Sequence, residues 1–251
     1  MLELNMKKII ILDYDNTLAK PKSSPTDDAL SLFKKLLSSK KIAILTAGRS
    51  IKGLRELLTS KISGDESYLL KNLFLCPKYG NSIFSWETDW FVLYEANSIE
   101  PREKKRIEKI VRRIDWKKYV VRSSKQRIHD KGPVISVNCI GNDATEQEKE
   151  DWDPKGTKRL GIKDDLIEKL GEEYEVYITG RNTVDIVPRG MNKADNVLKL
   201  LELISESSND CVYIGDEFNP NGNDYPILSL GIEVHKVDNP EETKDILNRY
   251  I

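Results

Sequence analysis

Short hydrophobic runs alternate with amphipathic segments along the first third of the chain. The run at 9–12 (Ile-Ile-Ile-Leu) ends at an aspartate, and similar runs lie at 42–45 and 73–76. Runs of this length, bounded by polar residues, are typical of strands buried on both faces of a parallel sheet. Residues with helical spacing fill the gaps between the runs. The alternation predicts a doubly wound sheet with crossover helices.

The middle of the chain has a different pattern. Residues 101–116 predict a helix, since Ile107, Val111 and Ile114 fall on one face of it. Four further segments predict strands and one predicts a helix: strands at 119–128, 134–140, 174–179 and 183–187, and a helix at 163–170. The last two strands flank a Gly-Arg-Asn turn, which is typical of a hairpin. This pattern indicates a second, α+β domain with antiparallel strands.

After residue 190 the alternation of strands and helices returns. Strands are expected at 211–214 and 232–237, with helices after Asn192 and after Pro240. The middle segment therefore interrupts one sheet domain. We expect an α/β fold with a doubly wound, parallel-sheet, Rossmann-like core from residues 1–87 and 189–251, and an inserted α+β cap domain at residues 88–188.

Composition narrows the class of protein. The chain has 251 residues, of which 32% are charged, and its net charge is −1. This balance argues against a general affinity for nucleic acid or membranes, and no apolar run approaches the roughly 20 residues of a membrane span. The N-terminus lacks a signal-peptide pattern, so a cytoplasmic location is expected. Cys76, Cys139 and Cys211 lack metal-ligand spacing and are expected to be buried, reduced thiols.

The predicted helix at 101–116 is rich in lysine and arginine. A nucleic-acid surface is one interpretation of such a helix. Glu103, Glu108 and the apolar stripe favour the other interpretation, a solvated helix of the cap. We therefore expect neither a nucleic-acid partner nor a membrane partner.

Polar residues suited to one chemistry follow the ends of the predicted strands. Asp13 and Asp15 follow the first strand, Thr46 the second and Asp216 a later one, while Lys193 begins a helix. Functional groups of open parallel sheets gather at the carboxyl ends of the strands. Each residue alone has an ordinary structural explanation, such as a turn or a helix cap. Together they indicate phosphoryl transfer, which needs charge neutralisation and in-line positioning.

The expected roles follow from that reaction. Asp13 attacks phosphorus, Asp15 protonates the leaving oxygen and then activates water, and Thr46 and Lys193 bind and neutralise the phosphate. Mg²⁺ prefers a few carboxylates combined with phosphate and water. Its expected ligands are Asp13, Asp15 or a backbone carbonyl beside it, Asp216, Asn223 and Asp224.

Four segments resemble, in their order, the motifs of the haloacid dehalogenase-like superfamily: Asp-Tyr-Asp-Asn-Thr-Leu (13–18), Leu-Thr-Ala-Gly-Arg (45–49), Asn-Lys-Ala (192–194) and Gly-Asp…Asn-Asp (215–224). The inserted cap is similar to that of the large α/β cap branch, which includes sugar phosphatases and eukaryotic-type phosphomannomutases. The resemblance implies Mg²⁺-dependent phosphoryl transfer through an aspartyl-phosphate on Asp13, with a small phosphorylated metabolite, such as a sugar phosphate, as substrate.

The nearer resemblance is to phosphomannomutase, and it covers most of the chain. It includes the long loop at 215–224, the cap strand at 134–141 and the hairpin at 185–190. That family has arginines at the positions of Asn142 and Lys149, where they bind the distal phosphate of a bisphosphate sugar. Asn carries no charge, and Lys is not equivalent to Arg at a bidentate phosphate site. The second phosphate anchor is therefore expected to be weak.

These departures favour a phosphatase over a mutase, because a phosphatase binds one phosphate and water completes its reaction. The alternative is a phosphomannomutase that uses Lys149 with Arg127 or Arg122 as its second anchor. A non-enzymatic binding protein is the rival from another class. The residues expected to bind substrate are Gly48, Arg49, Arg127, Lys149, Arg181 and Asp185. A monomer or a cap-mediated homodimer is expected.

Overall fold

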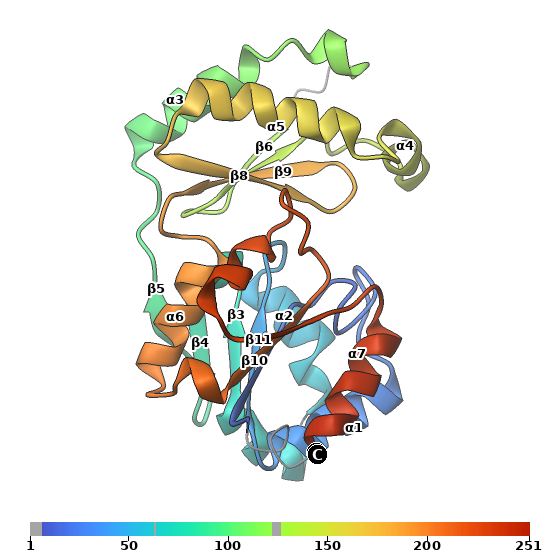
Figure 1. Ribbon diagram of the computed structural model, residues 1–251, viewed down its shortest axis with the longest axis vertical. Helices are drawn as coiled ribbons and strands as arrows, with labels where there is room; N and C mark the ends of the chain where they lie inside the picture. Colours follow the sequence, from blue (N-terminus) through green and yellow to red (C-terminus); the bar gives the residue numbers. More distant parts are fainter. Residues whose placement is uncertain (1–6, 63, 122–126) are drawn as a thin grey trace. The chain divides into compact units, whose positions relative to one another are not determined.

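The chain folds into two compact units. The structure is a computed structural model that describes residues 7–62, 64–121 and 127–251 (Figure 1). Unit 1 comprises Met1–Glu95, Lys193–Asn219 and Asp224–Ile251, and unit 2 comprises Ala96–Asn192 and Pro220–Asn223. Each unit has its own sheet and its own hydrophobic core.

Unit 1 contains a seven-stranded sheet in the order β11-β10-β1-β2-β3-β4-β5. Its strands are β1 (Ile9–Leu12), β2 (Lys41–Leu45), β3 (Leu73–Cys76), β4 (Ser82–Trp86), β5 (Trp90–Glu95), β10 (Cys211–Gly215) and β11 (Glu233–Lys236). The five strands from β11 to β3 run parallel, and the β4–β5 hairpin continues the sheet with antiparallel pairing. The carboxyl ends of β1, β2 and β10 therefore meet at one edge of the sheet.

Helices cover both faces of this sheet, as Figure 1 shows. The helices are α1 (Asp27–Leu37), α2 (Ile51–Leu57), α6 (Lys193–Leu203) and α7 (Pro240–Leu247). Because side chains alternate along a strand, Ile10 and Leu12 pack in the cluster with α1 and α7, whereas Ile9 and Ile11 pack in the cluster with α6. Full burial of one such side chain contributes about 1.5–3 kcal/mol.

Unit 2 contains a four-stranded antiparallel sheet in the order β6-β7-β9-β8. Its elements are β6 (Ile128–Asp130), β7 (Ile135–Asn138), β8 (Tyr174–Thr179), β9 (Thr183–Pro188), α3 (Pro101–Arg112), α4 (Glu146–Trp152) and α5 (Thr157–Leu170). Val137 and Ile186 pack with α3 and α5 in one hydrophobic cluster. The other face of the sheet is polar, with His129, Ser136, Asp185 and Tyr177 in one transverse row.

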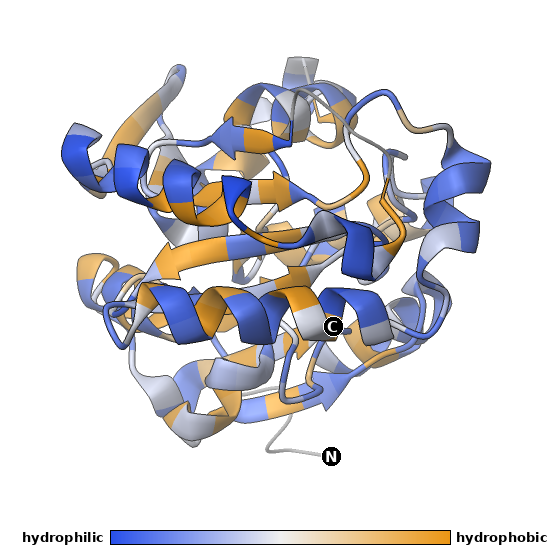
Figure 2. Cartoon of the chain, turned by 90° about the horizontal axis from the view of Figure 1, so that it is seen from above, coloured by the Kyte–Doolittle hydropathy of each residue, from blue (hydrophilic) through white to orange (hydrophobic). Residues whose placement is uncertain are grey.

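The structure confirms the doubly wound α/β core and the antiparallel α+β insertion. Figure 2 shows helices with hydrophilic and hydrophobic segments in alternation, as expected for elements with one buried face. Thr26 caps α1, accepting a hydrogen bond from the Ala29 amide at 3.4 Å, as threonine commonly does at a helix start. The three cysteines are buried and free. Among the described helices, none combines the length and apolar character that a membrane span requires.

The boundary between the units differs from the expected one. The predicted start of the insertion at residue 88 falls in the turn between β4 and β5, and β5 remains paired with β4 in the core sheet. The chain leaves unit 1 only after Glu95 and returns at Lys193, and residues 220–223 also group with unit 2. Sequence periodicity does not reveal this grouping, because it depends on contacts between distant segments.

The first residues of the predicted strand at 119–128 have a different local structure. A 3₁₀ turn spans Trp116–Tyr119, and Val120 has a left-handed φ of 55°, which interrupts an extended chain. Residues 122–126 lie outside the described ranges, and β6 begins where the predicted strand was expected to end.

Two glycines of the core should respond oppositely to alanine. Gly80 has a φ of +85°, and a Cβ there would lie 2.6 Å from Leu45 Cδ1 and 2.7 Å from Asn196 Cβ. We expect Gly80→Ala to lower the free energy of unfolding by about 2–4 kcal/mol.

Gly53 lies within α2, where a Cβ would meet Ser50 Oγ at 3.6 Å. Gly53→Ala should stabilise the protein by about 0.5–1 kcal/mol. Urea unfolding measures the free energy of unfolding of both variants. Equal changes in Gly80→Ala and Gly53→Ala would contradict the packing described for the two glycines.

Candidate active site

Lys193 is the centre of a buried cluster of charges in unit 1. It is the first residue of α6 and is fully buried. Its Nζ atom donates to Asp13 Oδ1 at 2.7 Å and to Asp224 Oδ1 at 2.6 Å. Burial alone lowers the pKa of Lys193, but the two carboxylates outweigh it and hold the pKa above its ordinary value. The ammonium group therefore remains charged inside the protein, where an unpaired charge would be very costly.

Asp224 is held by several donors besides Lys193. The Tyr213 hydroxyl donates to its Oδ1 atom, and the backbone amide of Glu217 donates to its Oδ2 atom at 3.0 Å. Gly215 makes room for this carboxylate, since a Cβ there would lie 2.6 Å from Asp224 Oδ2. These contacts make Asp224 a rigid partner for Lys193, and its role as a metal ligand remains a prediction.

Asp13 lies at the carboxyl end of β1 and is buried. Its amide donates to the Ile214 carbonyl at 2.9 Å, so β10 continues to hold the chain beyond the strand. Burial raises the pKa of Asp13 well above its ordinary value, while the Lys193 charge acts in the opposite direction. Lys193 contacts one of the two carboxylate oxygens of Asp13, Oδ1.

Asp15 forms an ion pair with Arg49, which was expected to bind substrate. Arg49 Nε donates to Asp15 Oδ2 at 3.2 Å, and Arg49 Nη2 donates to Asp15 Oδ1. The guanidinium group also lies over the Tyr14 ring, 4.9 Å from its centroid. The pair brings together two residues that the sequence assigned to different tasks.

Asp216 follows β10, and its carboxyl group binds a proton more tightly than an ordinary aspartate does. Burial, followed by repulsion from Asp224, raises its pKa to about 7. Asn16 Nδ2 donates to Asp216 Oδ2 at 3.3 Å, which links the loop after β1 to the loop after β10. A bound cation would favour the ionised form and remove the repulsion between the carboxylates.

The donor set fits a hard cation with few protein ligands. Over the described ranges, no three His, Cys, Asp or Glu side chains form a ready-made metal cluster. Mg²⁺ commonly takes one or two carboxylates and completes its shell with water and substrate phosphate. Asp13 and Asp216 suit this requirement. The buried Asn223 Oδ1 atom has no hydrogen-bond partner within the described part of the chain, and it is also an oxygen of the type that Mg²⁺ binds.

Thr46 and Gly48 lie just beyond β2, on the same edge of the sheet. Thr46 is buried, and its amide donates to the Cys76 carbonyl at 3.0 Å. A Cβ on Gly48 would meet nothing within 4 Å, so packing does not explain this glycine. Their predicted contacts with phosphate remain predictions.

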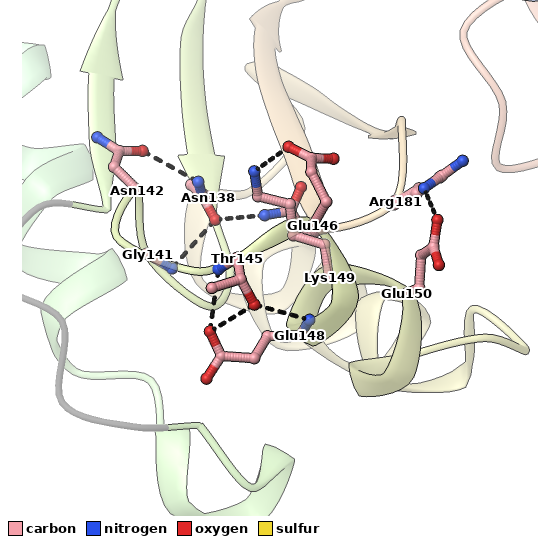
Figure 3. Close-up of polar contacts among 10 residues, drawn as sticks. Asn138, Gly141, Asn142, Thr145, Glu146, Glu148, Lys149, Glu150 and Arg181 are labelled. Atoms are coloured by element: carbon pink, nitrogen blue, oxygen red, sulfur yellow. Dashed lines mark hydrogen bonds and ion pairs between the residues drawn. The ribbon is translucent and has the colours of Figure 1, made fainter.

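The predicted substrate residues of unit 2 contact other unit 2 residues. Lys149 pairs with Glu146 at 2.8 Å, and Arg181 pairs with Glu150 (Figure 3). Asn142, at the position of a family arginine, accepts from Asn138 Nδ2 at 3.0 Å and contacts His129 Nε2 at 2.8 Å. Figure 3 shows Asn138, Gly141 and Asn142 at the turn that follows β7, and Arg181 with Glu150 at some distance from it.

Arg127 and Asp185 are more deeply placed. Arg127 donates to the Cys139 carbonyl, and its guanidinium group lies 4.5 Å from the Trp116 ring centroid. Burial lowers the pKa of Arg127. Asp185 accepts from the Ser136 hydroxyl and lies 3.9 Å from Lys131 Nζ. Their roles toward substrate remain predictions, and Arg122 lies outside the described residues.

Sequence reasoning found the charged cluster but missed two of its members. The structure brings Asp13, Lys193, Asp216 and Asp224 together in unit 1. Tyr213 and Asn16 were not singled out. A tyrosine inside an otherwise apolar strand was an available signal, because a buried hydroxyl needs a partner.

Comparison with known proteins shows which protein family the chain belongs to. The family model of haloacid dehalogenase-like hydrolases matches residues 10–231, and the chain belongs to that family. Phosphomannomutase 2 of Dictyostelium discoideum is 23% identical over 254 residues, covering 98% of this chain and 97% of that protein.

Solved structures share the fold. The N-terminally truncated IMP-nucleotidase of Plasmodium falciparum has a TM-score of 0.72 at 21% identity, covering 100% of this chain and 71% of the nucleotidase. A haloacid dehalogenase-like hydrolase of Bacteroides thetaiotaomicron has a TM-score of 0.62 at 16% identity, covering 97% and 99%. At these identities the likeness confirms the fold class alone.

The raised pKa of Asp216 predicts a pH-dependent response to metal. Because its folded pKa of about 7 exceeds the ordinary 3.8, the contribution of Asp216 to stability is complete below about pH 4 and is lost as pH rises through 7. Mg²⁺ binds the ionised form, so it should raise the melting temperature more at pH 8 than at pH 6. Asp216→Asn should remove this difference, and equal shifts at both pH values would contradict the assignment.

Gly215 should be intolerant of a side chain. A Cβ would lie 2.6 Å from Asp224 Oδ2 and 2.8 Å from Tyr213 Cε1, and the hydrogen bonds of Asp224 restrict its escape. We expect Gly215→Ala to lower the free energy of unfolding by about 3 kcal/mol or more, since it overpacks the site and strains a buried ion pair. Urea unfolding measures the loss. Gly48→Ala is the control for folding, and wild-type stability in Gly215→Ala would refute the crowding.

Proposed function

We propose that the protein is a Mg²⁺-dependent phosphatase that hydrolyses the phosphate monoester of a sugar or a related small metabolite. The observation that carries the proposal is the buried bridge from Lys193 to Asp13 and Asp224. It keeps a nucleophilic carboxylate next to a permanent positive charge at the end of a parallel strand. That combination suits the transfer of a phosphoryl group, whose negative charge must be neutralised in the transition state.

The reaction has two steps on Asp13. First, Asp13 Oδ2 forms a bond to phosphorus while the bond to the leaving oxygen breaks, and the carboxyl group of Asp15 gives that oxygen its proton. Second, water attacks the same phosphorus, Asp15 takes the proton of the water, and the bond from phosphorus to Asp13 breaks. Inorganic phosphate is released, and Asp13 and Asp15 return to their starting states. Lys193 and Thr46 contact the phosphate oxygens in both steps.

Mg²⁺ would be held by Asp13 and Asp216, with Asn223 as a further oxygen donor, and would supply positive charge to the phosphoryl oxygens. Asp224 is assigned to Lys193 instead, because Lys193, Tyr213 and the Glu217 amide already contact it. Because Asp224 contacts Lys193 and is not a metal ligand in this proposal, the ammonium group keeps its position whether or not Mg²⁺ is bound.

The contacts of the cap cations support hydrolysis over isomerisation. A mutase must hold a second phosphate at the far end of its sugar. Lys149 is paired with Glu146, Arg181 with Glu150, and a neutral asparagine stands at position 142. Binding a second phosphate would therefore have to compete with carboxylates of the cap itself. Phosphomannomutase activity remains the second candidate, supported by the similarity to phosphomannomutase 2 over most of the chain.

One assay separates the two activities. Purified protein, Mg²⁺, mannose 1-phosphate and a hexose 1,6-bisphosphate are incubated together, and free phosphate and mannose 6-phosphate are measured in the same sample. We expect phosphate release without stoichiometric mannose 6-phosphate, and loss of the release in excess chelator. Mannose 6-phosphate without free phosphate would overturn the phosphatase proposal in favour of the mutase.

Asp13→Asn is the matched control for the nucleophile. It keeps the shape of the side chain and removes the charge, so we expect at least about a 10³-fold loss of kcat, in line with removal of a covalent nucleophile. Its fold is checked by circular dichroism. Wild-type rates in this variant would refute the assignment of Asp13.

A further inference from the structure

The Asp216 carboxylate has fewer contacts than its neighbour Asp224. Asp224 accepts hydrogen bonds from three donors. Within the described ranges, the Asp216 side chain receives one hydrogen bond, from Asn16 Nδ2 to its Oδ2 atom at 3.3 Å. Asn16, Asp216 and Asp224 all belong to unit 1. Asn16 is therefore the side chain best placed to fix the orientation of the Asp216 carboxylate.

The backbone of Asn16 forms a turn that few residue types adopt without strain. Its φ is 59°, in the left-handed region, which asparagine tolerates better than most residues other than glycine. The turn is closed by hydrogen bonds from the Asn16 amide to the Ala19 carbonyl at 2.8 Å and from the Ala19 amide to the Tyr14 carbonyl at 3.0 Å. Glycine would fit this turn at least as well. What asparagine adds there is the amide group that reaches Asp216.

A second contact joins the same two segments of unit 1. The Asp13 amide donates to the Ile214 carbonyl at 2.9 Å, and Ile214 lies on β10, which Asp216 follows. The loop after β1 is thus attached to β10 by its backbone and to the loop after β10 by the Asn16 side chain. These loops carry Asp13 and Asp216, the two carboxylates proposed to bind Mg²⁺. Their separation therefore depends on one backbone contact and one side-chain contact.

We propose that Asn16 is a positioning residue for the metal site, and that it holds the Asp216 carboxylate in an orientation that favours binding of Mg²⁺. The inference rests on the proposed function in so far as Asp13 and Asp216 bind the metal. Its physical basis is that a hydrogen-bonded ligand is already oriented and loses less conformational freedom when the cation binds. Because this hydrogen bond is exposed to solvent, we expect it to contribute about three- to tenfold in affinity.

Asn16→Gly isolates the contribution of the side chain. Glycine adopts a φ of 59° without strain, so the turn is kept and the donor alone is lost. Asn219→Ala is the matched control. Asn219 Nδ2 donates to Glu217 Oε2 at 2.8 Å, so this variant removes another exposed bond from an amide to a carboxylate in the loop after β10. The probe is Mg²⁺ alone, and its apparent dissociation constant is obtained from the rise in melting temperature with Mg²⁺ concentration at pH 8.

We expect Asn16→Gly to raise the apparent dissociation constant for Mg²⁺ by about three- to tenfold, since the ligand must be oriented at the moment of binding. Asn219→Ala should stay within about twofold of wild type, because its hydrogen bond does not involve Asp216. An unchanged constant in Asn16→Gly, or an equal rise in both variants, would overturn the inference. A wild type whose melting temperature does not respond to Mg²⁺ would overturn it as well.

A kinetic measurement separates positioning of the metal ligand from a general structural effect. With p-nitrophenyl phosphate as substrate, the Mg²⁺ concentration that gives half the maximal rate should rise by about three- to tenfold in Asn16→Gly. The value of kcat at saturating Mg²⁺ should stay within about threefold of wild type. A loss of kcat that saturating Mg²⁺ does not restore would contradict a positioning role. If the wild type binds Mg²⁺ but hydrolyses no phosphate ester, the proposed function fails, and the dissociation constants alone decide the inference.

Discussion

The structure of unit 1 depends on how a single ammonium group is buried. Lys193 is fully buried, and it retains its charge because Asp13 and Asp224 lie within hydrogen-bond distance of its Nζ atom. Removal of either carboxylate would leave the ammonium group with a single carboxylate in hydrogen-bond contact. This pairing requires the end of β1, which carries Asp13, to lie close to the start of α6, which carries Lys193. The loop after β10, which carries Asp224, must lie there as well.

That requirement explains several neighbouring residues. The Tyr213 hydroxyl shares Asp224 Oδ1 with Lys193, and the Glu217 amide holds the other oxygen, Oδ2. Gly215 has no side chain because the carboxylate lies where its Cβ would be. Asp216 is the next residue in the chain, and its pKa is raised first by burial and then by repulsion from Asp224 and Glu217. The cluster is thus one electrostatic unit rather than a set of independent side chains.

The sequence predicted the fold and the strand-end residues for clear physical reasons. The run at 9–12 is apolar at every position because both faces of β1 are covered, and Asp13 follows it because the strand end is where polar groups can meet. Helix α7 was predicted at Pro240 and begins there. Local periodicity was sufficient for these features.

Other features depend on contacts that no local pattern encodes. The Asp15–Arg49 pair joins residues 34 positions apart, and the Tyr213–Asp224 bond depends on the conformation of a long loop. The boundary after Glu95 was missed because β5, with partly exposed Phe91 and Val92, is an edge strand whose membership of the sheet depends on β4. In unit 2, the Arg181–Glu150 pair joins residues 31 positions apart, and the pattern of neither segment indicates it.

The pairing of Asp15 with Arg49 has a consequence for any anion that reaches Arg49. The guanidinium group donates to both carboxylate oxygens of Asp15. A phosphate group offers a guanidinium the same kind of bidentate contact and can compete with the carboxylate for it. Binding of such an anion at Arg49 would leave both oxygens of Asp15 open to other donors. Anion binding and exposure of the Asp15 carboxylate would then be a single event.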